Sequence, residues 1–219
     1  MVQQAGAKKS SVLTYIAILN GGSIISTIIL ASKSPRRRAL LEGLRVEFKT
    51  LDTDIDEDID SQRPLQEAVC DIARRKAEFA ARRARPGDIV IAADTLVLLD
   101  GAVLGKPEDE ADAFKMLNLL SGTWHQVYTG LCVMSGSGEA VCDFEMTDVK
   151  FRDLELEEIE GYIETGEPFD KAGSYGIQER GALLVEKISG DYFNVMGLPL
   201  SKLGLMLRRF GVDLLAKGG

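Results

Sequence analysis

The chain has 219 residues, enough for one large domain, and its 45% hydrophobic and 27% charged residues are ordinary for a soluble globular protein. The formal net charge of -8 excludes a surface that attracts nucleic acid polymers or anionic membranes as a whole, so an anion site must be a local concentration of positive charge. The three cysteines lack a CxxC pattern, which indicates free thiols in a reducing cytoplasm and no zinc site.

Residues 1–26 are expected to be an N-terminal extension, either partly disordered or an artefact of the start site. Lys8 and Lys9 precede an apolar stretch that loosely resembles a signal peptide. Polar and glycine residues at 20–23 interrupt that stretch, which argues against a membrane span. We therefore expect one domain over residues 27–212, followed by a tail over 213–219.

The remaining sequence alternates between strand and helix patterns. In chain order the expected elements are a strand at 28–32, a helix at 35–44, an acidic loop at 51–60, a helix at 64–82, a strand at 88–99, a hairpin turn at 100–101 into 102–106, a helix from Pro107 ending before Gly122, strands at 124–134 and 139–152, a helix at 154–164, a glycine-rich loop at 166–181, a strand at 182–188 and a helix at 199–210. Both crossovers and hairpins are present, so the pattern predicts an α/β fold with a mixed sheet.

The first helix begins in an unusual way. Ser34 is an expected N-cap and Pro35 suits the first helical position, but Arg36, Arg37 and Arg38 then fill a turn where the helix dipole repels cations. A bound phosphate would reverse that repulsion, because helix N-termini and arginine side chains both bind phosphate oxygens. Successive helical residues point about 100° apart, so we expect one or two arginines to bind phosphate and another to face water.

Three further charges interrupt apolar patterns. Lys76 falls on the apolar face of its helix, Asp94 interrupts a buried strand, and Lys106 ends the hairpin. Each has an ordinary alternative, namely snorkelling for Lys76, a buried salt bridge for Asp94 and a surface charge for Lys106. The acidic run at 52–60 is either a solvated loop or a source of carboxylates for a hard divalent cation. Taken together, these charges suit a polyphosphate and metal site.

Six motifs in this order resemble those of the Maf family of nucleoside triphosphate pyrophosphatases: LASKSPRRRALL, AADTLVLLDG, GKP, YTG, GEPFDKAGSYGIQERG and NVMGLPL. The resemblance implies a two-lobed α/β fold like that of inosine triphosphate pyrophosphatase, with a central substrate cleft. It also implies hydrolysis of a nucleoside triphosphate to monophosphate and pyrophosphate with a divalent metal (Mg²⁺ or Mn²⁺), and a homodimer. The alternative is a nucleotide-binding regulator of cell division or septum formation that has no catalytic activity.

The resemblance also implies roles for individual residues. Asp94 would be the proton acceptor, and Glu57 with Asp94 would hold the metal. The expected specificity residues are Arg36, Thr95 and Gln178, and the expected phosphate-binding residues are Ser32, Arg37, Lys76 and Lys106. The Arg, Thr and Gln combination is the pattern of the subgroup that acts on dTTP and UTP. The chain departs from many members at Glu179, where they have a glycine directly after the glutamine.

The single histidine, His125, excludes a histidine-rich metal cluster. It is a conceivable general base. Its place at the start of a strand, beside Trp124, favours a structural role instead.

Overall fold

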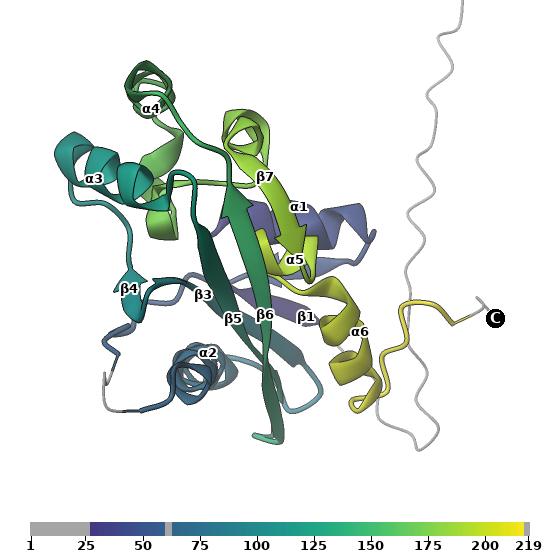
Figure 1. Ribbon diagram of the computed structural model, residues 1–219. Helices are drawn as coiled ribbons and strands as arrows, with labels where there is room; N and C mark the ends of the chain where they lie inside the picture. Colours follow the sequence, from purple (N-terminus) through teal and green to yellow (C-terminus); the bar gives the residue numbers. More distant parts are fainter. Residues whose placement is uncertain (1–26, 60–62, 217–219) are drawn as a thin grey trace, which may run out of the picture.

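A mixed sheet of seven strands runs through the part of the chain that the computed structural model describes, residues 27–59 and 63–216. The strand order is β2-β1-β3-β5-β6-β7, with β4 paired to β3 (Figure 1). The strands are β1 (Ile28–Ala31), β2 (Phe48–Thr50), β3 (Ile89–Leu99), β4 (Ala102–Leu104), β5 (Trp124–Ser135), β6 (Ala140–Phe151) and β7 (Val185–Ser189). The α-helices are α1 (Pro35–Gly43), α2 (Leu65–Ala81), α3 (Glu110–Leu120), α4 (Leu156–Ile163), α5 (Tyr192–Val195) and α6 (Leu200–Arg208), and short 3-10 turns cover Glu167–Asp170, Ala172–Ser174 and Glu179–Leu183.

Strand β3 is a central strand, and the pairing of the sheet changes from parallel to antiparallel at this strand. It pairs in parallel with β1 on one edge and antiparallel with β5 on the other. The strands β5, β6 and β7 then continue as antiparallel neighbours. The predicted α/β fold with a mixed sheet is confirmed.

The two faces of the sheet carry different helices, because alternate residues of a strand point to opposite sides. Ile91 and Ala93 pack in one core cluster with residues of α1 and α6, whereas Val90 and Ala92 pack with alanines of α2. Figure 1 shows α2 on one side of the long strands and α1 and α6 on the other. A second large cluster, on the α1 face, lies at the far end of β3 and includes α3 and α4. The core is therefore divided between the two ends of the long strands.

Several predicted boundaries are corrected by the structure. Helix α3 begins at Glu110 and not at Pro107, because the side chain of Asp109 caps it by accepting from the backbone N–H of Asp112 at 2.8 Å. The strand predicted at 182–188 begins at Val185, because Glu179–Leu183 forms a 3-10 turn. Strand β2 and helix α5 are too short to give a periodic pattern, and they were not predicted.

Two cysteines also differ from expectation. Cys132 and Cys142 lie directly opposite each other on β5 and β6, with their Cα atoms 4.1 Å apart, and they form a disulfide. The prediction of free thiols is therefore wrong for this pair and holds for Cys70. The predicted extension, residues 1–26, lies outside the described residues. Within the described ranges, no helix has both the length and the hydropathy needed to span a membrane.

Candidate active site

A gap in the pairing of β3 creates the site. Strand β1 ends at Ala31, opposite Ala92, and β4 pairs with β3 only from Val97 onward. Between them lie Asp94 and Thr95, whose side chains point to opposite faces of the sheet. Because neither β1 nor β4 covers this edge, both side chains border a single cavity of about 540 Å³. Helix α1 begins just after β1, so its N-terminus faces the same space.

The cavity collects all of the residues predicted from the sequence. Its lining includes the following predicted residues: Ser32, Arg36, Arg37, Glu57, Lys76, Asp94, Thr95, Lys106 and Gln178. Across the whole lining, six lysines and arginines face three carboxylates, in a chain whose net charge is -8. The cavity is therefore a local positive region on an acidic protein, as a polyanionic ligand requires.

Lys76 and Asp94 form a buried ion pair. The Nζ atom of Lys76 on α2 lies 2.6 Å from Oδ1 of Asp94 and 2.7 Å from Oε1 of Glu57. Both Lys76 and Asp94 are only 6% exposed, whereas the Glu57 side chain is about half exposed. Burial opposes ionisation of Glu57, but the hydrogen bond and charge of Lys76 outweigh it and lower the pKa of that carboxyl group. One ammonium group therefore brings two carboxylates together at the cavity.

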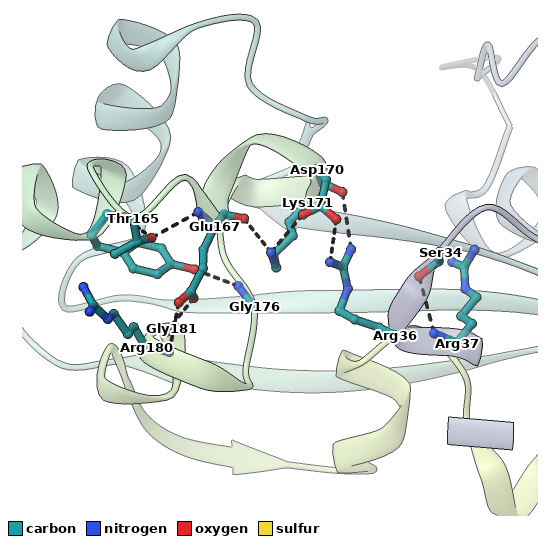
Figure 2. A network of polar contacts seen from close by, with 11 residues as sticks. Ser34, Arg36, Arg37, Thr165, Glu167, Asp170, Lys171, Gly176, Arg180 and Gly181 are labelled. Atoms are coloured by element: carbon teal, nitrogen blue, oxygen red, sulfur yellow. Dashed lines mark hydrogen bonds and ion pairs between the residues drawn. The ribbon is translucent and has the colours of Figure 1, made fainter. Parts of the chain in front are cut away.

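The three arginines of α1 have three different environments. Arg36 donates from Nη1 to Oδ2 of Asp170 at 2.8 Å, a contact that joins α1 to the loop before β7 (Figure 2). Arg37 points inward and Arg38 is exposed to solvent. The expectation that one arginine faces water is confirmed. The predicted cap is also present, since Ser34 accepts from the backbone N–H of Arg37.

Arg37 connects three segments around the cavity. Its Nε donates to the carbonyl oxygen of Gly197 at 2.7 Å, its Nη2 to Oγ1 of Thr95 at 2.9 Å, and its Nη1 to Oγ of Ser32 at 3.3 Å. A guanidinium has five N–H groups, so one N–H on each terminal nitrogen remains for a ligand. Burial lowers the pKa of Arg37, and the nearby Asp94 carboxylate opposes that shift.

The loop that carries Gln178 is held by Glu167. The Glu167 carboxylate accepts from the backbone N–H groups of Arg180 and Gly181, both at 3.2 Å (Figure 2). Between these residues and Gln178, Glu179 has a φ of 56°, in the left-handed region. This conformation favours glycine, which explains why a glycine after the glutamine suits the loop. Here the exposed Glu179 adopts the same conformation at some cost in backbone strain.

His125 is a structural residue, as expected. It is 2% exposed, its Nε2 lies 2.7 Å from the hydroxyl of Tyr175, and its ring packs edge-on against Phe151 and Tyr175. Burial lowers its pKa to about 4. The residue does not line the cavity, although Tyr175 does.

Sequence reasoning did not identify Asp170 as the partner of Arg36, nor Thr129 as the partner of Thr95. Both lie within motifs quoted above, so the motifs marked the segments. No spacing rule connects Arg36 with a residue 134 positions away. Only the fold shows these pairings.

Comparisons with known proteins show which family the chain resembles. The family model described as "Maf-like protein" matches residues 27–210. The chain is 46% identical over 192 residues to a dTTP/UTP pyrophosphatase of Caldicellulosiruptor bescii, covering 86% of this chain and 96% of the relative. It is 50% identical over 193 residues to a dTTP/UTP pyrophosphatase of Caldanaerobacter subterraneus subsp. tengcongensis, covering 87% and 93%. Among solved structures, it is similar to the Ham1 protein of Staphylococcus aureus with a TM-score of 0.40 and 18% identity, covering 57% of this chain and 72% of that one.

Proposed function

The chain belongs to the Maf-like protein family, and from that membership we propose that it hydrolyses nucleoside triphosphates, dTTP and UTP above all, to the monophosphate and pyrophosphate. The observation that carries the proposal is the buried pair of Asp94 and Lys76 beside a cavity lined by six cations. A protein that only binds nucleotides has no need of a buried carboxylate facing a polyphosphate.

The triphosphate would be held by Ser32, Arg37, Lys76 and Lys106. The Ser32 hydroxyl already accepts from the Ser34 N–H at 3.1 Å and from Arg37, and its hydrogen has no acceptor among the described residues. It can therefore donate to a phosphate oxygen. The two remaining N–H groups of Arg37 can also donate to phosphate oxygens. The side chain of Lys106 is exposed and can reach the outer phosphates.

Asp94 would act as the proton acceptor. A water oxygen attacks the α-phosphorus, the bond from that phosphorus to the bridging oxygen breaks, and pyrophosphate leaves while Asp94 takes the water proton. The Lys76 ammonium, 2.6 Å from Oδ1 of Asp94, holds this carboxylate in place at the cavity.

A divalent cation, Mg²⁺ or Mn²⁺, would be held by Glu57 and Asp94. Two carboxylates that converge on one ammonium offer the hard oxygen donors that such ions take, and Mg²⁺ in particular binds through one or two carboxylates plus substrate phosphates. Within residues 27–59 and 63–216 there is no group of three or more His, Cys, Asp or Glu side chains arranged as a metal site, so phosphate oxygens would complete the coordination. When bound, the cation supplies charge neutralisation at the phosphates.

Base selection is assigned to Arg36, Thr95 and Gln178. Uracil and thymine present two carbonyl oxygens on either side of an imide N–H. The Gln178 amide can donate to a carbonyl oxygen, and the imide N–H can donate to the glutamine oxygen or to the Thr95 hydroxyl. Cytosine presents a ring nitrogen and an amino group there, so the same pose leaves buried groups unpaired at a cost of about 1–3 kcal/mol each.

The test is pyrophosphate release from a panel of dTTP, UTP, CTP and GTP with Mg²⁺. We expect kcat/KM for dTTP and UTP to exceed that for CTP by about tenfold or more, and purines to be poorer still. No release from any nucleotide would favour the binding-only alternative. Release with CTP or GTP preferred would overturn the base assignment and leave the chemistry standing.

Gln178→Ala is the matched variant for the base assignment. It should reduce the difference between UTP and CTP more than it weakens binding of the common triphosphate. A homodimer and a cytoplasmic location remain predictions, and sedimentation of the purified chain tests the first.

A further inference from the structure

Two threonines face each other across β3 and β5 next to the cavity. Thr95 and Thr129 are directly opposite in the antiparallel register, and their hydroxyl oxygens lie 2.9 Å apart. Thr95 lines the cavity, whereas Thr129 is completely buried and does not. Any effect of Thr129 on a ligand must therefore act through Thr95.

The direction of the hydrogen bond between the threonines follows from a third group. The Thr129 hydroxyl donates to the carbonyl oxygen of Asn194 at 3.0 Å, and a carbonyl can only accept. Because a hydroxyl has a single hydrogen, Thr129 can only accept from Thr95. Thr95 thus donates to Thr129 and accepts from Arg37. Its hydroxyl has no hydrogen left for a ligand and presents only one lone pair.

Asn194 is itself fixed by hydrogen bonds from its side chain. It is completely buried on α5, and its side-chain amide donates to the carbonyl oxygen of Val127 at 2.9 Å and to Oγ1 of Thr147 at 3.0 Å. Thr147 donates in turn to the carbonyl oxygen of Asp191. The carbonyl that orients Thr129 is therefore fixed to the sheet on which Thr129 stands, and the order of donors and acceptors is built into the fold.

We propose that Thr129 is a positioning residue for base selection, which makes the Thr95 hydroxyl a pure hydrogen-bond acceptor and so favours a base with an imide N–H. The inference rests on the proposed function and specifies how one of its selectivity residues works. Uracil and thymine supply the donor that the Thr95 lone pair needs. The ring nitrogen of cytosine at that position is itself an acceptor and would face another acceptor. Without the Thr129 hydroxyl, the Thr95 hydroxyl can rotate and donate to the ring nitrogen of cytosine. The site then tolerates cytosine as well.

The experiment compares Thr129→Val, which keeps the shape and removes the hydroxyl, with Thr129→Ser, which keeps the hydroxyl. The readout is the ratio of kcat/KM for UTP to that for CTP, because a general loss of activity cancels between two substrates with the same triphosphate. We expect Thr129→Val to lower the ratio about five- to tenfold, the effect of one net hydrogen bond, and Thr129→Ser to retain the wild-type ratio.

A double-mutant cycle shows whether the effect passes through Thr95. In a Thr95→Val background, Thr129→Val should leave the ratio unchanged, because the hydroxyl it orients is gone. A folded Thr129→Val protein with the wild-type ratio would overturn the inference, as would an equal effect in the Thr95→Val background. If Thr129→Val and Thr129→Ala both fail to fold while Thr129→Ser folds, Thr129 is only a structural residue and the inference is equally overturned. A wild type that does not discriminate UTP from CTP would instead defeat the base assignment in the proposed function and leave the pyrophosphatase chemistry standing.

Discussion

At the scale of single residues, the buried pair of Asp94 and Lys76 is the centre of the candidate site. Each charge alone would be costly to bury, and at 2.6 Å each compensates the other. Glu57 adds a second carboxylate from a loop that is partly open to solvent. The site thus has one rigid carboxylate on a central strand and one on a loop.

We predict that Asp94→Asn folds normally and lowers kcat on the order of a hundredfold or more, because asparagine cannot accept a proton. Lys76 keeps Glu57 as a partner, which limits the loss of stability. Steady-state kinetics and a thermal melt measure both effects. The matched control is Asp88→Asn, which changes another buried carboxylate just before the same strand, outside the cavity, and should retain activity. Near-normal kcat in Asp94→Asn would remove Asp94 from the mechanism.

The lowered pKa of His125 predicts how the free energy of unfolding depends on pH. Its pKa is about 4 in the folded protein and 6.5 in an unfolded chain, so the unfolded state takes up a proton first as the pH falls. The stability contributed by the neutral ring is complete above pH 6.5 and is lost progressively toward pH 4. The linkage relation gives a loss of about 2 kcal/mol between pH 7 and pH 5.

Urea unfolding of the wild type and of His125→Gln at these two pH values measures the loss. The carboxylates contribute equally to both proteins, so the wild type should lose about 2 kcal/mol more than the variant. Equal losses would mean that His125 titrates normally in the folded state.

Which residues can be predicted from a sequence depends on how they break a pattern. Asp94 and Lys76 interrupt apolar runs, so the cost of burying a charge is enough to single them out. Glu57 is one of several acids in a loop, and only the resemblance selects it. Thr129 and Asp170 break no pattern, since a threonine suits a strand and an aspartate suits a turn.

At the scale of elements, the close contact between α2 and β5 keeps Lys76 on α2 in register with Asp94 on β3. A side-chain carbon added at Gly130 on β5 would lie 2.2 Å from the carbonyl oxygen of Val69 on α2. The two backbones touch at this point, and a glycine is required there. Lys76 lies two turns further along the same helix.

We predict that Gly130→Ala loses about 2–3 kcal/mol of unfolding free energy, because α2 must move away from the sheet. The same movement displaces Lys76 from Asp94, so kcat should fall about tenfold or more. Gly161→Ala is the matched control, since its added carbon meets nothing within 4 Å on the exposed side of α4. It should be neutral or stabilising by up to about 1 kcal/mol. Equal behaviour of the two variants would show that α2 adjusts freely.

Element prediction succeeded where periodic patterns are long and failed where they are short. Helices α1 and α2 and strands β3, β5 and β6 follow from their patterns and from the cap at Ser34. Helix α5 has four residues and β2 has three, which is too few for a period to emerge. These short elements form because long-range partners hold them, as Asn194 is held by the sheet.

At the scale of the whole molecule, every residue assigned to the site lies between 32 and 197, inside the family match. The mixed sheet could be predicted from the alternation of crossovers and hairpins. The strand order could not, because β3 pairs with three strands and nothing in its sequence ranks these partners. The open edge that makes the cavity is a result of that order.

We predict that a chain lacking residues 1–26 retains kcat/KM for UTP within about twofold, because no residue assigned to the site is removed. The described contacts of the domain begin at Thr27, whose carbonyl oxygen accepts from the N–H of Ile89. Nucleotide kinetics and sedimentation of the two forms provide the comparison. A soluble, folded truncation without activity would assign the extension to the site or to the assembly.

The parallel pairing of β1 with β3 has a consequence for the order of folding. The strands β5 and β6 are joined by a short turn and can pair early, whereas β1 must find β3 across α1, β2 and α2. Trp124, the only tryptophan, stands at the start of β5 opposite Lys150, so its fluorescence reports the completed pairing of β5 with β6. In refolding from urea we expect this signal to recover before pyrophosphatase activity, and a single coincident phase would contradict that order. We therefore expect β1, the first strand of the described residues, to be placed late, so that the active site is completed only in the closing step of folding.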